Sequence, residues 1–114
     1  MRKAIYMAAL AAIVASCTTT TKPLYNWKGY DEAVYNYIKS PSDQTVTEIE
    51  AVYEKLMTNL GSREVPPPGL CADYGYLLIK NGQTEKGKEL LIRETMLYPE
   101  SKPFIDRILK RFDP

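Results

Sequence analysis

Apolar side chains recur at helical spacing from Trp27 onwards, and the chain there lacks the strict alternation that marks a strand. In the first helical segment, residues 27–39, the side chains that share one side are Trp27, Tyr30, Val34, Tyr37 and Ile38. Ser40 and Pro41 end this predicted helix, because the residue before a proline disfavours helical geometry. The pattern therefore predicts an all-α fold.

A second helix is expected after a cap at Ser42 or Asp43. Its apolar residues fall in one narrow stripe made of Val46, Ile49, Tyr53, Leu56, Met57 and Leu60. Gly61 follows this stripe and is placed to end the helix in the left-handed conformation.

The connector of residues 61–69 contains three consecutive prolines, Pro66 to Pro68, and is expected to form a stiff polyproline-like corner, a docking ligand being the alternative. Further helices are predicted at residues 70–80, 84–98 and 101–112. The last has Pro103 in its first turn, and its inner side is expected to hold Phe104, Ile105, Ile108, Leu109 and Phe112. The result is a small five-helix array.

Residues 68–99 resemble a tetratricopeptide repeat, a helical hairpin of about 34 residues. The matching positions are Gly75 and Gly87 at the helix crossing, Gly82 in the turn, Leu91 in the interface and the closing Pro99. Gly87 replaces the usual alanine, Cys71 a tryptophan and Leu78 a tyrosine. One repeat length earlier Tyr53 occupies a position that needs a small residue. The resemblance thus implies one TPR-like hairpin, with the flanking helices as its caps.

The N-terminal segment combines basic Arg2 and Lys3, an apolar run from Ala4 to Val14, and small residues before Cys17. This resembles the bacterial lipobox, which implies a signal peptide (residues 1–16) and a lipidated cysteine with its tether (residues 17–23). An ordinary signal peptide with a free thiol and a short buried helix are the alternatives. The remaining residues, 24–114, are expected to form a single TPR-like helical domain. By resemblance to enteric lipoproteins, Thr18 implies the outer membrane.

Charge and composition argue against several classes of function. The chain has 15 basic and 14 acidic side chains, and removing Arg2 and Lys3 leaves 13 basic ones, so no long-range attraction for nucleic acid is expected. There is no histidine, no cysteine cluster and no glycine-rich phosphate loop. We therefore predict no catalytic residue, no metal site, no cofactor and no enzymatic activity.

The aromatic opening of residues 24–30 and the stretch from Pro67 through Gly75, Gly82 and Glu94 to Ser101 resemble a family of small bacterial lipoproteins of unknown function. The resemblance covers nearly all of residues 24–112. Members are often encoded beside two other lipoproteins, one of them like the curli secretion channel. This implies a role in an envelope assembly, with other envelope lipoproteins as partners, and it transfers no catalytic residue.

Two functions are compatible with these patterns. The favoured one is a lipid-anchored, non-enzymatic interaction subunit, and the alternative is a module that binds a small ligand or peptidoglycan through its tyrosines. The first helix has a wider apolar arc than one neighbour can bury, and so Trp27, Tyr30 and Tyr35 are the candidate partner-binding residues. The alternative is that the proline connector or the last helix covers this surface.

We expect the mature protein to begin at Cys17 and to be diacylated or triacylated there, because the lipobox directs both modifications. Intact mass spectrometry of the membrane fraction measures this. Several acyl chains hold a protein firmly on a membrane, whereas one chain binds only reversibly. The Cys17→Ala substitution removes the site of acylation, so the variant should leave the membrane fraction. A Cys17→Ala protein that still fractionates with the membrane would contradict the prediction.

Overall fold

The computed structural model describes Arg2 and residues 21–113. Cys17 and, apart from Arg2, the predicted signal peptide lie outside the described residues, as does the tether before Thr21. Residues 21–113 form five α-helices, one short 3-10 helix and no strand, so the all-α prediction is confirmed. The elements are α2 (Tyr30–Lys39), α3 (Asp43–Thr58), α4 (Leu70–Lys80), α5 (Thr84–Leu97), η1 (Pro99–Ser101) and α6 (Lys102–Phe112).

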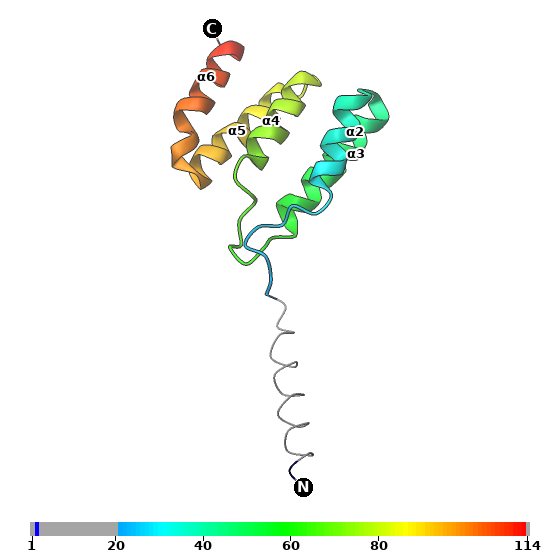
Figure 1. Ribbon diagram of the computed structural model, residues 1–114. Helices are drawn as coiled ribbons and strands as arrows, with labels where there is room; N and C mark the ends of the chain where they lie inside the picture. The colour runs from blue at the N-terminus through cyan, green and yellow to red at the C-terminus, as the bar shows by residue number, and fades with distance from the viewer. Residues whose placement is uncertain (1, 3–20, 114) are drawn as a thin grey trace.

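The helices form two hairpins and a closing helix, as Figure 1 shows. α2 packs on α3, and α4 packs most extensively on α5. α3 also contacts α4, and α5 contacts α6, so each helix packs against its successor. Because the chain reverses at each connection, α2, α4 and α6 run in the same direction (Figure 1).

The predicted start of the first helix at Trp27 is wrong by three residues, because α2 begins only after Gly29. Gly29 has φ 84°, in the left-handed region that interrupts a helix. The Asn26 side chain donates to the Asn59 carbonyl (2.7 Å) and accepts from the Lys28 N–H (3.0 Å), which fixes the turn ahead of α2. The other helices begin and end within two residues of the prediction, and Ser42 caps α3 in a capping box with Thr45.

Gly61 does not end α3 in the left-handed conformation, contrary to the sequence-based expectation. α3 ends at Thr58, and Gly61 has no positive φ. The glycine is needed for space: a Cβ at this position would lie 2.6 Å from the Leu24 carbonyl carbon. Beside it, the N–H groups of Ser62 and Arg63 donate to the carbonyls of Pro23 (2.9 Å) and Leu24 (3.1 Å). The folded domain therefore begins at Pro23.

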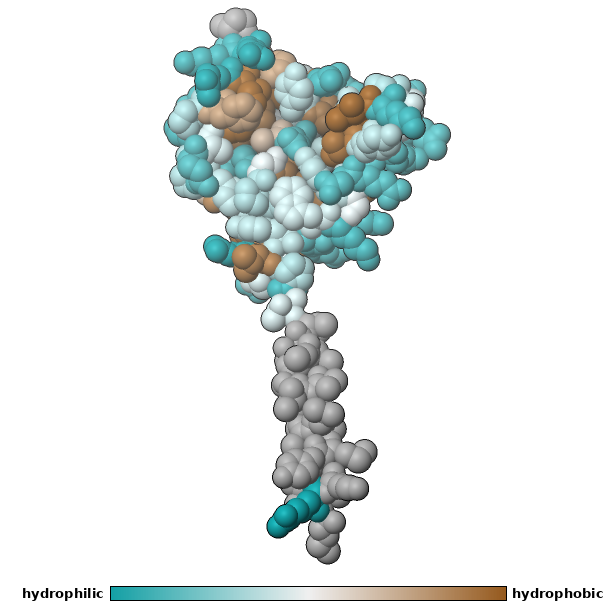
Figure 2. Space-filling view, viewed as in Figure 1, coloured by the Kyte–Doolittle hydropathy of each residue, from teal (hydrophilic) through white to brown (hydrophobic). Residues whose placement is uncertain are grey.

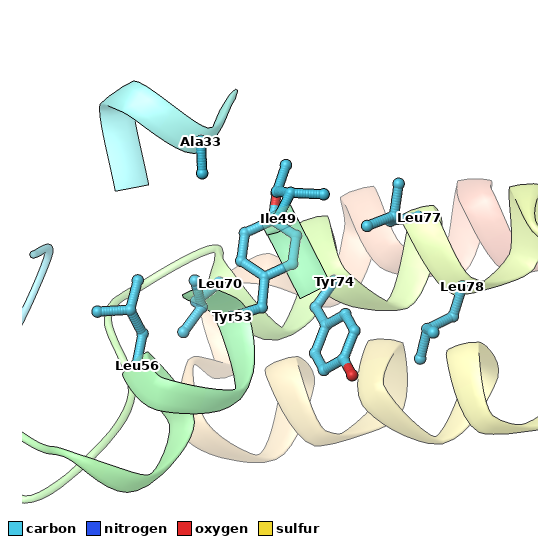
Figure 3. Packing of buried hydrophobic residues seen from close by; sticks show 8 residues of the cluster. All are labelled: Ala33, Ile49, Tyr53, Leu56, Leu70, Tyr74, Leu77 and Leu78. Atoms are coloured by element: carbon cyan, nitrogen blue, oxygen red, sulfur yellow. The ribbon is translucent and has the colours of Figure 1, made fainter. Parts of the chain in front are cut away.

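The larger apolar core joins the two hairpins through α3 and α4. Figure 3 shows its buried residues, which are Ala33, Ile49, Tyr53, Leu56, Leu70, Tyr74, Leu77 and Leu78. The rings of Tyr53 and Tyr74 meet at 5.3 Å, and the Tyr74 hydroxyl donates to Glu54. Fully burying a large apolar side chain contributes about 1.5–3 kcal/mol, so this cluster holds α3 against α4. The stripe predicted for the second helix is thus the one that is buried.

A smaller core joins α4, α5 and α6 through Ala72, Ile79, Leu91 and Ile105. Ile108, Leu109 and Phe112 of α6 are partly buried against it, as predicted. Phe104 is 55% exposed, so its assignment to the inner side of the last helix is wrong. Ile105 takes the inner position, and Phe104, one residue earlier, is rotated by about 100° towards solvent.

The α4–α5 hairpin crosses at two glycines. A Cβ on Gly75 would lie 2.6 Å from the Gly87 carbonyl oxygen, and a Cβ on Gly87 would meet the Gly75 carbonyl oxygen in turn. The obstacle is backbone, which moves less readily than a flexible side chain. This close approach confirms the role expected for both glycines and explains why α5 accepts the cost of about 1 kcal/mol that a helical glycine brings.

Two side chains from the end of α5 and the residue that follows it fix the proline connector. Glu94 is 2% exposed, and its oxygens accept from the N–H groups of Gly69 (2.7 Å) and Ala72 (3.3 Å) at the start of α4. The Tyr98 hydroxyl donates to the Pro66 carbonyl (2.6 Å). Pro66 and Pro67 are buried, which favours the stiff corner over the docking ligand.

Glu94 performs the capping that Gly69 cannot, because glycine has no side chain to accept a hydrogen bond. A carboxylate at this end of α4 also interacts favourably with the positive end of the helix dipole. The side chain that caps α4 therefore comes from the following helix, which couples the position of α4 to that of α5.

The Glu94→Ala substitution removes both acceptors and leaves two N–H groups without partners. Unsatisfied buried donors cost about 1–3 kcal/mol each, so we expect the free energy of unfolding to fall by about 3 kcal/mol and Tm by roughly 15 °C. Thermal unfolding followed by circular dichroism measures this. Glu94→Gln keeps one acceptor and should lose less.

Glu89→Ala is the matched control, because Glu89 is an exposed residue of the same helix. We expect it to change the free energy of unfolding by no more than about 0.5 kcal/mol. A Glu94→Ala protein as stable as Glu89→Ala would contradict the capping role.

Candidate functional site

A groove of about 630 Å³ lies between α2, α4 and α6. Tyr30, Val34, Tyr37 and Ile38 of α2 form one wall, and Phe104, Arg107, Ile108 and Arg111 of α6 form the other. The base is made by Ala72, Asp73, Tyr76, Leu77 and Lys80 of α4 with Ile49 and Tyr53 of α3. Figure 2 shows apolar side chains gathered over α2 and over α6, with a more polar strip between them.

The α2 wall results from an apolar arc that α3 covers only in part. Ala33 points at α3 and is buried, Tyr30, Val34 and Tyr37 are half-buried, and Ile38 is 71% exposed. The proline connector does not line the groove, and α6 forms the opposite wall. The sequence left open that the proline connector or α6 covers the part of the α2 apolar arc that α3 leaves exposed. Neither element does so.

The polar groups of the groove are held in place. The Tyr30 hydroxyl donates to Asp73 Oδ2 (2.5 Å), linking α2 to α4. Burial, together with this bond, raises the pKa of Tyr30 above the ordinary tyrosine value, so the phenol remains a donor at neutral pH. The Lys80 ammonium lies 5.9 Å from the Tyr37 ring centre and 5.8 Å from that of Tyr76, within reach of cation–π attraction to both.

The three candidate residues from the sequence do not form one surface. Trp27 is 43% exposed and meets Tyr30 edge-on, with ring centres 4.9 Å apart, while Tyr30 lines the groove. Tyr35 is 61% exposed and lies outside the groove lining, with Lys39 over its ring at 5.6 Å. The structure therefore joins Trp27 to Tyr30 and separates Tyr35 from both.

Sequence reasoning missed the cations and Phe104. Phe104, Arg107, Ile108 and Arg111 follow the spacing i, i+3, i+4 and i+7, which places them on one face of α6 beside the buried stripe. That periodicity was a usable signal. Lys80 at the end of α4 gave no such signal, because only the packing of the hairpins brings it to the groove.

The groove offers binding chemistry: apolar and aromatic walls, three cations and one carboxylate. Across residues 21–113, no cluster of three or more histidine, cysteine or acidic residues is arranged to hold a metal ion. Within the same range, every helix is too short or too polar to cross a membrane.

Cys71 lies outside the groove, completely buried at the start of α4. Its Sγ is 3.7 Å from Met57 Sδ. Burial raises the pKa of the thiol to about 11, with Glu94 adding to the rise and Arg93 opposing it. At neutral pH the group is therefore an unreactive thiol that packs as a small buried apolar residue.

A model of the family described as a domain of unknown function (DUF4810) matches residues 24–108. No curated protein and no solved structure matches the chain.

We expect Cys71 to react with a water-soluble alkylating reagent only when the domain opens, because both its burial and its raised pKa suppress the thiolate. Mass spectrometry of the labelled protein measures the rate, with the denatured protein as the control. Labelling in the native state as fast as in denaturant, or a dimer band lost on reduction, would contradict the prediction.

Proposed function

The chain belongs to the DUF4810 family, and we propose that it is a non-enzymatic interaction subunit of a bacterial cell-envelope assembly, anchored by lipid on Cys17. The observation that supports this most is the open groove between α2, α4 and α6. Its apolar side chains are exposed on two facing helices, and exposed apolar surface beside polar groups is typical of a place where a partner binds.

We also assign the α4–α5 hairpin as TPR-like, with α2–α3 and α6 as its caps. The reciprocal contact of Gly75 and Gly87 and the position of Pro99 directly after α5 support this assignment. Stacked helical hairpins create concave surfaces that bind other proteins. In this chain the concave surface is the groove lined by α2, α4 and α6.

The anchor orients the groove in this proposal. The domain begins at Pro23, and residues 18–22 reach roughly 16 Å when extended at about 3.3 Å each. Figure 1 shows α2, α4 and α6 running away from the end at which residues 21–24 enter the domain. The far end of the groove then faces away from the membrane surface, where a partner has access to it.

Thr18 supports placement in the outer membrane, with the domain facing the periplasm. The resemblance described above makes other envelope lipoproteins, and a link to secretion or transport, the first partners and process to test.

Purification of the native lipidated protein in detergent tests the proposal. We expect partner proteins in stoichiometric amount. The Ile38→Ala and Phe104→Ala substitutions should each weaken co-purification, because a buried apolar anchor contributes about 2 kcal/mol, roughly thirtyfold in affinity. Both residues are exposed in the domain alone, so Tm should stay within a few degrees of wild type.

Tyr35→Ala is the matched control on α2, since Tyr35 is similarly exposed but lies outside the groove. Loss of partners on Tyr35→Ala and not on Ile38→Ala would place docking on the outer side of α2. Stoichiometric glycan or small molecule without a protein partner would instead favour the alternative, a ligand- or peptidoglycan-binding lipoprotein.

A further inference from the structure

We propose that the groove binds an acidic peptide segment of the partner protein, with carboxylates against Lys80, Arg107 and Arg111 and apolar side chains against Ile38 and Phe104. This inference rests on the proposed function, because it specifies the chemistry of the partner that the same groove receives.

The groove holds an excess of positive charge that the described chain does not neutralise. Its one carboxylate, Asp73, already accepts the Tyr30 hydroxyl. Across residues 21–113, the ion pairs within 4.0 Å involve Lys86, Lys88 and Lys102, and none involves Lys80, Arg107 or Arg111. The chain as a whole is near neutral, so this charge is local to the groove.

The geometry of the groove strengthens this local charge. A cleft with apolar walls concentrates the field of the cations that line it and attracts ligands of opposite charge. Lys80 lies over two tyrosine rings, so its side chain is already positioned and loses less freedom when a carboxylate binds. Arg107 and Arg111 are one helical turn apart on α6 and line the same wall, and Arg107 Nε donates to the Pro103 carbonyl one turn earlier (3.3 Å).

The apolar side chains define the rest of the ligand. Ile38 is 71% exposed on one wall and Phe104 is 55% exposed on the other. The volume of about 630 Å³ lies within the range of pockets that enclose a drug-sized molecule, so the bound segment is short. Ile38 lies near the end of α2 and Phe104 near the start of α6, so two apolar or aromatic side chains among a few acidic residues satisfy both the charge and the volume.

An anionic membrane surface fits these observations less well. The apolar stripe of α6 is used in the core, where Ile105 is completely buried, and so it is not available to lie on lipid. Lys80 is exposed at the end of α4 and lines the base of the groove, between the walls formed by α2 and α6. A peptide enters the cleft and reaches all three cations.

A random peptide library selected on the immobilised native lipidated protein in detergent tests the inference. We expect the selected peptides to be enriched in aspartate and glutamate together with apolar or aromatic residues. Fluorescence anisotropy of a labelled selected peptide should show binding that weakens as salt is added. The double variant Arg107→Gln/Arg111→Gln should bind it about tenfold more weakly, from two ion pairs of modest strength each.

Lys110→Gln is the matched control, because Lys110 is an exposed cation of the same helix outside the groove. It should leave peptide affinity within about twofold of wild type, and all variants should keep the Tm of the parent. Equal losses in Lys110→Gln and in the double variant would show only a general charge effect and would overturn the inference.

Other outcomes separate this inference from the proposed function. Selection of neutral apolar peptides whose binding depends on Phe104 would overturn the acidic ligand and leave the interaction subunit standing. Binding of phosphatidylglycerol vesicles or of muropeptides that is lost in the double variant, without acidic peptides in the selection, would overturn the inference in favour of lipid or glycan. Absence of both selected peptides and co-purifying proteins would overturn the inference and the proposed function together.

Discussion

The buried carboxylate of Glu94 is the constraint on which the start of α4, and with it the α4–α5 hairpin, depends. It lies on α5, yet its two oxygens accept the N–H groups at the start of α4, where Gly69 offers no side chain of its own. The beginning of α4 is thus determined by a residue of the helix that follows it. Tyr98, one turn later, fixes the Pro66 carbonyl in the same way. Since α4 forms the base of the groove, these bonds also position the groove.

The two sides of α4 are packed by opposite means. On the α5 side, Gly75 and Gly87 let the backbones touch, so no large side chain separates the helices. On the α3 side, Tyr53 and Tyr74 fill the space between the hairpins with aromatic rings. Hydrogen bonds from Tyr30 to Asp73 and from Tyr74 to Glu54 cross the same boundary. These phenol–carboxylate bonds require a defined geometry, so they fix the relative position of the helices more closely than apolar packing alone.

The groove exists because α2 and α6 each carry more apolar surface than their neighbouring helices bury. α2 has one neighbour with which to bury its apolar arc, so Tyr37 and Ile38 remain on its open side. α6 buries Ile105 against the core and turns a second face, with Phe104 and Arg111, towards α2. The exposed faces of α2 and α6 therefore lie opposite each other, with α4 between them. A partner bound there completes the burial that the chain alone does not achieve.

The sequence by itself determined the helices and the buried face of most of them. The stripe of Ile49, Tyr53 and Leu56 and the glycines of the α4–α5 crossing were readable because helical periodicity and the need for small residues are local properties. Turn positions were readable less well. Gly61, expected in the left-handed conformation, is needed for space instead, and Gly29, inside the predicted first helix, adopts that conformation. The role of a loop glycine depends on which distant backbone passes beside it. Only the tertiary structure decided the groove, because Lys80, Ile38 and Arg111 come from three helices and share no sequence pattern. Their meeting depends on Glu94, whose capping bonds join residues more than twenty positions apart, and no local spacing encodes such a contact.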